Sequence, residues 1–81
     1  MSKIPRDMGA DKLIKLLKTF GYEKTRQNGS HIRIQCEKND TIHKITIPNH
    51  NPIKIGTLSN ILENIAAYQK LSKEQLIQKL F

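Results

Sequence analysis

The chain has 81 residues and a formal net charge of +7, from 14 Lys and Arg against 7 Asp and Glu. This length predicts one domain over residues 1–81 with a small core, and the sequence has neither the apolar run of about 18 residues that a membrane span needs nor the apolar stretch of a signal peptide. The one cysteine excludes an internal disulfide, so we expect a cytoplasmic protein.

The positive charge is unevenly distributed along the chain. Residues 1–56 carry 11 basic and 5 acidic side chains, whereas residues 57–81 carry 3 and 2. Such a surplus favours a polyanionic partner, and nucleic acid is the first candidate. The alternative is a small basic protein without such a partner.

The N-terminal part predicts an irregular segment over residues 1–8 and then a helix over residues 9–20. The helix has an apolar stripe at helical spacing, made of Leu13, Ile14, Leu16, Leu17 and Phe20. Lysines at positions 12, 15 and 18 occupy its polar side, as a solvated face or as contacts to a phosphate backbone. Gly21 is placed to end the helix in the left-handed conformation.

Three strands are predicted next, over residues 22–27, 30–37 and 42–47. The first is polar on both sides, which is typical of an edge strand, and Pro48 stops the third. Asn28-Gly29 is a strong signal for a two-residue hairpin loop. This loop would place Arg26 opposite His31.

The same register places Lys24 opposite Arg33, so that Lys24, Arg26, His31 and Arg33 share one cationic face. The turn over residues 38–41 predicts three pairs that keep the isoleucines on the other face, namely Cys36 with His43, Ile34 with Ile45 and Ile32 with Ile47. Lys44 and Thr46 then lie on the cationic face.

The C-terminal part predicts a loop over residues 48–55 and a helix over residues 56–68, with Thr57 as its cap. Ser72 and Gln75 have the spacing of a capping box that opens a last short helix. The predicted order is α-β-β-β-α-α. This is an α+β fold in which helices pack on one face of a three-stranded antiparallel sheet.

His31 is the best candidate for chemistry. Metal-free RNA cleavage requires a group that exchanges a proton with the 2′-hydroxyl or the leaving oxygen near neutral pH, and imidazole suits this task. Arg26 and Arg33 would hold the scissile phosphate, and Gly29 would let it approach the backbone closely. The alternative is a surface histidine on a face that only binds RNA.

Other chemistry is weakly supported. Cys36 beside His43 is half a metal site at most, and a packed thiol is the simpler interpretation. His50 lies in a Pro/Asn loop, where solvent or a partner is the default contact. Tyr22 is a lone candidate for base stacking. The acidic residues are scattered, and no nucleotide-binding motif is present, so we predict no metal and no cofactor.

Several segments together resemble the HicA toxins, the YcfA-like mRNA interferases. They are residues 13–22, the turn Arg26-Gln27-Asn28-Gly29-Ser30-His31, residues 45–50, residues 53–58 and Ile61-Leu62. The resemblance implies a fold similar to the double-stranded-RNA-binding domain and a type II toxin that cleaves mRNA without a metal. It also implies a HicB-type antitoxin that covers the active face. The family's catalytic histidine matches His31, and its glycine matches Gly29. Residues 63–71 lack the glycine that ends the second helix in many relatives, so that helix is expected to run longer here.

Three functions remain open at this point: a metal-independent endoribonuclease, a non-catalytic RNA-binding module, and a protein whose basic face docks an acidic partner. In the first, His31 is the general base or acid. The predicted phosphate-binding residues are Lys24, Arg26, Gly29, Ser30, Arg33 and, more peripherally, Lys44. A second proton carrier is not identified, and Tyr22, Lys24 and water are its candidates.

Overall fold

The computed structural model describes residues 4–81, so the start of the predicted irregular segment lies outside the described residues. Its elements, in chain order, are α1 (Ala10–Leu17), the short 3-10 helix η1 (Lys18–Phe20), β1 (Glu23–Asn28), β2 (His31–Lys38), β3 (Thr41–Pro48), α2 (Ile55–Gln69) and α3 (Lys73–Leu80). The strands form one antiparallel sheet in the order β1-β2-β3. This confirms the predicted α+β fold.

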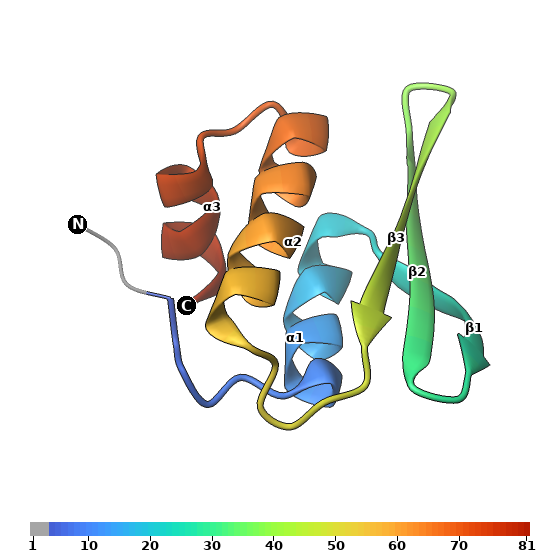
Figure 1. The fold of residues 1–81 in the computed structure, drawn as a ribbon. Helices are drawn as coiled ribbons and strands as arrows, with labels where there is room; N and C mark the ends of the chain where they lie inside the picture. The colour runs from blue at the N-terminus through green and yellow to red at the C-terminus, as the bar shows by residue number, and fades with distance from the viewer. Residues whose placement is uncertain (1–3) are drawn as a thin grey trace.

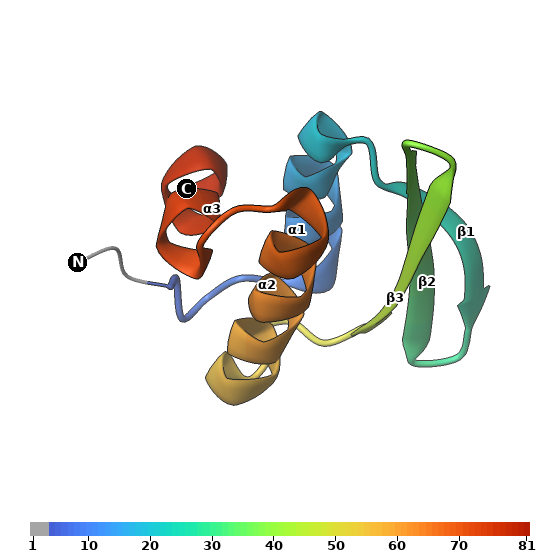
Figure 2. The same ribbon diagram turned by 90° about the horizontal axis from the view of Figure 1, so that it is seen from above.

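The helices all lie on one side of the sheet, and its other face is uncovered (Figure 1). Seen from above, α1 and α2 lie between the sheet and α3, which is farthest from it (Figure 2). The fold is therefore the dsRBD-like sandwich with a third helix behind it. Within the described residues, no helix has the length and apolar character that crossing a bilayer requires.

The core lies between the sheet and the first two helices. Ile32, Ile34 and Ile47 of the sheet are buried against leucines of α1 and α2, including Leu13, Leu17, Leu58 and Leu62. Each such side chain contributes roughly 1.5–3 kcal/mol when it leaves water. The predicted pairs of β2 with β3 are confirmed, and they keep the isoleucines on the helix side.

Helix ends follow the sequence in two places and depart from it in one. Gly21 is left-handed (φ 93°) and follows η1 as predicted, and the capping box of Ser72 and Gln75 opens α3. The prediction that Thr57 caps the second helix is wrong, because α2 begins at Ile55 after Lys54 and has no side-chain cap. α2 extends to Gln69, and Lys70 takes the left-handed conformation (φ 59°) that a glycine usually adopts.

The predicted register of the first hairpin is also wrong. Its two-residue loop is Gly29-Ser30, with Asn28 opposite His31 and Arg26 opposite Arg33. Gly29 has φ 62° and is the first central residue, as in a type II′ turn. Moving the loop by one residue shifts each pair by two positions, so Arg26 stays on the face of His31. The irregularity between Lys24 and Arg26 then changes the face of Lys24, which pairs with Ile34.

A candidate nucleic-acid interface on the open face of the sheet

The alternation of β2 decides which side chains reach the open face. Ile32, Ile34 and Cys36 are buried under the helices, so their neighbours His31 and Arg33 point to the uncovered side and are exposed. Arg26 joins them from β1 because it pairs with Arg33. The open face therefore carries an imidazole and two guanidinium groups on adjacent strands.

These side chains line a shallow depression of about 370 Å³, which is formed by Arg26, Asn28, His31, Arg33 and Thr46. We call it the open-face depression. None of its lining residues is acidic. Arg26 and Arg33 lie directly opposite each other, an arrangement that costs stability because like charges repel. A bound anion between them would remove this cost.

The turn residues border the depression. A Cβ built on Gly29 meets nothing within 4 Å, so the backbone there is open to a ligand. The carbonyl oxygen of Ser30 accepts a hydrogen bond from the Asn49 backbone N–H at 2.6 Å, which ties the turn to the loop after β3. Lys44 pairs with Gln35, two positions along β3 from Thr46, and is peripheral to the depression.

The predicted placement of Lys24 on this face is wrong. Lys24 lies on the helix side of β1, where it lines a groove with Lys15 and Lys18 of the first helix region. Its Nζ donates a hydrogen bond to Oε1 of Gln27 at 2.7 Å. A role of Lys24 in binding phosphate therefore stays a prediction, and it is no longer one that uses the open-face depression.

Asn28 is a lining residue that the sequence prediction did not assign to the site, because it was placed inside the hairpin loop. The signal that identifies it is Gly29-Ser30, since Gly-Ser is itself a two-residue hairpin loop. With that loop, Asn28 becomes the last residue of β1 and the direct neighbour of His31. Its amide adds a neutral hydrogen-bonding group between cations.

Tyr22 does not reach the open face, so it can neither stack on a base there nor transfer a proton there, the two roles for which the sequence made it a candidate. Its side chain is fully buried, and burial raises the pKa of Tyr22 to about 12. Its hydroxyl lies 2.6 Å from Nδ1 of His43, whose ring stacks on Tyr68 with 4.6 Å between centroids. Burial lowers the pKa of His43. Tyr22, His43 and Tyr68 therefore form a structural network between the sheet and the helices.

Cys36 lies opposite His43 as predicted and is packed in the core. Its thiol contacts the carbonyl oxygen of Phe20 at 3.4 Å and the amide of Gln69 at 3.8 Å. In the part of the chain from residue 4 onward, no group of three or more His, Cys, Asp or Glu side chains is arranged to hold a metal ion.

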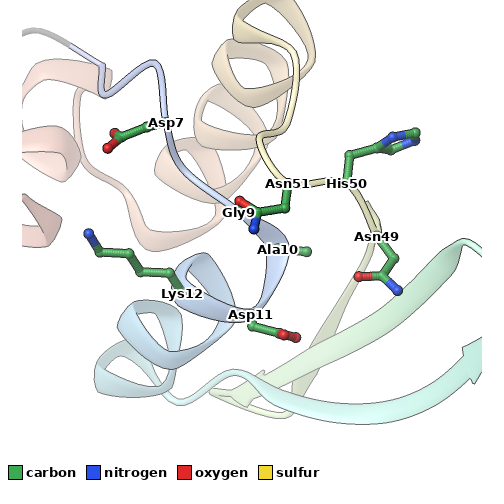
Figure 3. A pocket seen from close by; sticks show the side chains of 8 residues that line it. All are labelled: Asp7, Gly9, Ala10, Asp11, Lys12, Asn49, His50 and Asn51. Carbon is green, nitrogen blue, oxygen red and sulfur yellow. The ribbon is translucent and has the colours of Figure 1, made fainter.

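His50 lies away from the open-face depression. A separate cavity of about 270 Å³ is formed where the loop after β3 meets the start of α1, and His50 is at its border (Figure 3). The imidazole extends away from the other labelled side chains, whereas the side chain of Asn51 lies beside Gly9 (Figure 3). The carbonyl of His50 accepts a hydrogen bond from the Ala10 N–H at 3.1 Å, so the loop is fixed by its backbone.

The structure is a small α+β domain with the topology of the double-stranded-RNA-binding domain and a cationic open face. The family model described as the HicA toxin of bacterial toxin–antitoxin systems matches residues 10–66. The chain belongs to the HicA toxin family. No curated protein and no solved structure matched the chain. The match spans the elements from α1 through most of α2, including the whole open-face depression.

Proposed function

We propose that the protein is an endoribonuclease toxin that cleaves mRNA without a metal ion and uses His31 as its general acid/base. The observation that carries the proposal is the convergence of His31, Arg26 and Arg33 in one depression on the uncovered face of the sheet. Membership of a toxin family supports a toxic activity. The chemistry at this depression would supply it.

The proposed reaction is attack of a ribose 2′-hydroxyl on the adjacent phosphorus. His31 takes the 2′-hydroxyl proton, and Arg26 and Arg33 bind the phosphate oxygens and offset the charge that develops on them. The P–O5′ bond breaks as the new P–O2′ bond forms, and the leaving oxygen receives a proton. Since Tyr22 is buried and Lys24 lies on the other side of the sheet, we infer that water supplies this proton.

Gly29, Ser30 and Lys44 complete the proposed phosphate-binding set. Gly29 offers an unobstructed backbone beside the depression, Ser30 a hydroxyl in the turn, and Lys44 a cation further along β3. A cytoplasmic location follows from mRNA as the substrate.

The proposed partner besides RNA is a HicB-type antitoxin, since the family belongs to toxin–antitoxin systems. An antitoxin that covers the open face would exclude RNA, and acidic groups on it would complement the cationic side chains there. A non-catalytic RNA-binding module is the second candidate function, because an exposed cationic face by itself accounts for binding without cleavage.

The test is cleavage of a single-stranded RNA in the presence of EDTA. The parent protein is expected to produce fragments, and His31→Ala is expected to lose about 100-fold or more of the rate while it still binds RNA. His50→Ala is the matched control, because it removes an exposed imidazole outside the depression. If His31→Ala cuts as fast as His50→Ala, the proposed mechanism is wrong. If neither the parent nor the control cuts, the binding module is the better description.

A further inference from the structure

A second cationic surface lies on the helix side of β1. Lys15, Lys18 and Lys24 line a groove of about 270 Å³ between the first helix region and β1, which also has Asp11, Ile14 and Ile32 on its walls. We call it the α1–β1 groove. Lys18 and Lys24 continue into an adjoining hollow beside Gly21 and Glu23. The lysines therefore form a continuous track along this side of the strand.

Two features of the fold create the track. Helical spacing places Lys15 and Lys18 one turn apart on the same side of the helix. The irregularity in β1 brings Lys24 to the side that faces this helix. All six side chains of β1 are exposed, so both sides of the strand are open to a ligand.

The positive charge of the groove is not neutralised by ion pairs. Over residues 4–81, the one ion pair within 4.0 Å joins Lys73 to Glu63, on other elements. Three lysines and two acidic residues, Asp11 and Glu23, line the groove and its adjoining hollow, so the lysines are in excess there. Ammonium groups act as point charges that suit phosphate oxygens without a demand for sequence.

The groove and the open-face depression meet at the same strand edge. Lys24 borders the groove, Arg26 borders the depression, and they are separated along β1 only by Thr25. β1 is an edge strand with no neighbour on its outer side, which Figure 1 shows at the border of the sheet. A polymer bound on both sides therefore has to turn around this edge.

We propose that the α1–β1 groove binds the backbone of a single RNA strand that passes over the edge of β1 from the open-face depression. The inference rests on the proposed function, which it extends by defining the substrate as unpaired RNA longer than the reacting dinucleotide. A duplex does not fit this path, because it is too stiff to bend around the edge of one strand. Duplex DNA, for comparison, has a persistence length of about 150 base pairs. A flexible single strand turns within a few nucleotides.

The experiment measures RNA binding by fluorescence anisotropy in a His31→Ala background, which keeps the RNA intact. The probes are single strands of about four and about sixteen nucleotides, the limits of common single-strand site sizes, and a duplex of the longer sequence. The test variant is Lys15→Gln/Lys18→Gln, in which glutamine keeps helix propensity and removes charge. The control is Lys70→Gln/Lys79→Gln, which removes the same charge from the other end of the chain.

The test variant is expected to bind the long strand about tenfold more weakly and to keep its affinity for the short strand. The slope of the logarithm of its binding constant against the logarithm of the salt concentration is expected to become shallower. The change should be about 0.7 for each RNA phosphate that is no longer neutralised. The control is expected to change neither affinity by more than about twofold. Cleavage of the short strand, with His31 restored, is expected to stay at the parent rate.

The proposal would be overturned by unchanged affinity of the test variant for the long strand, by equal weakening in the test and control variants, or by tighter binding of the duplex than of the long strand. Loss of binding to the cognate antitoxin with RNA binding intact would assign the groove to a protein partner instead. These outcomes are independent of the cleavage test, because slow cleavage by His31→Ala does not depend on the groove. If the protein binds neither the short nor the long strand, both proposals are overturned.

Discussion

The two faces of β2 have different roles, although their side chains alternate along one strand of eight residues. One face is apolar and buried, with Ile32, Ile34 and Cys36 against the helices. The other is polar and exposed, with His31 and Arg33 in the open-face depression. The buried face holds the sheet to the helices, and the exposed face holds charges whose mutual repulsion costs stability. Neighbouring residues of β2 therefore serve stability and the proposed activity in alternation.

Truncation of the buried face is expected to have the largest effect. Ile34→Ala removes a fully buried side chain from the centre of the sheet, so the free energy of unfolding should fall by about 2–5 kcal/mol. Chemical denaturation measures this decrease. A small domain has little stability to spare, so RNA binding should disappear with the folded state. A variant that stays as stable as the parent would contradict the packing described for β2.

The exposed face is expected to behave in the opposite way. Arg33→Gln should lower the cleavage rate by about 100-fold, since it removes a cation from the reacting phosphate. It should also raise the free energy of unfolding by about 0.2–1 kcal/mol, because Arg26 then has no like charge opposite it. Single-turnover kinetics and thermal melting measure the two effects.

Lys44→Gln is the control for Arg33→Gln. It removes the same charge from the same face at a peripheral position, so its effect on cleavage should be several-fold smaller. Equal decreases in the two variants would mean that overall charge, rather than the open-face depression, drives the reaction.

Salt distinguishes the two faces, because RNA binding and stability should respond to it differently. Raising the salt concentration from about 50 to 200 mM should weaken RNA binding by about tenfold or more, because phosphate contacts release counterions. The hydrophobic contacts of the buried face do not depend on screening, so the melting temperature should not fall, and screening of the repulsion between Arg26 and Arg33 should raise it slightly. A binding constant that does not respond to salt would exclude a phosphate-led interface.

The smallest expected effect concerns acid. Burial lowers the pKa of His43, so between its ordinary value near 6.5 and the lower value of the folded state the unfolded chain binds more protons. Stability should therefore fall as the pH decreases through this window. Melting temperatures at pH about 7 and about 5.5 should differ less in His43→Phe than in the parent. His50→Ala should keep the parent's difference; if it does not, the acid sensitivity arises elsewhere.

The sequence alone determined the order of the elements, the two faces of β2 and β3, and the end signals at Gly21 and Ser72. These features depend on local periodicity and on conformations that few residues adopt, so they can be read within a few positions of the chain. His31, Arg26 and Arg33 were placed on one face for the same reason. The error of one residue in the hairpin loop preserved that face, because it shifted each pair by two.

Only the tertiary structure decided where Lys24 and Tyr22 lie. β1 is polar and exposed on both sides, so its sequence carries no periodic signal that fixes a bulge, and the pairing with β2 determines it. Tyr22 is adjacent to exposed residues in sequence, yet its side chain is buried in the core, where its hydroxyl meets His43 of a strand distant in the chain. Contacts with other elements, rather than the local sequence, set both positions. The position of Lys24 completes the lysine track on the helix side of the sheet.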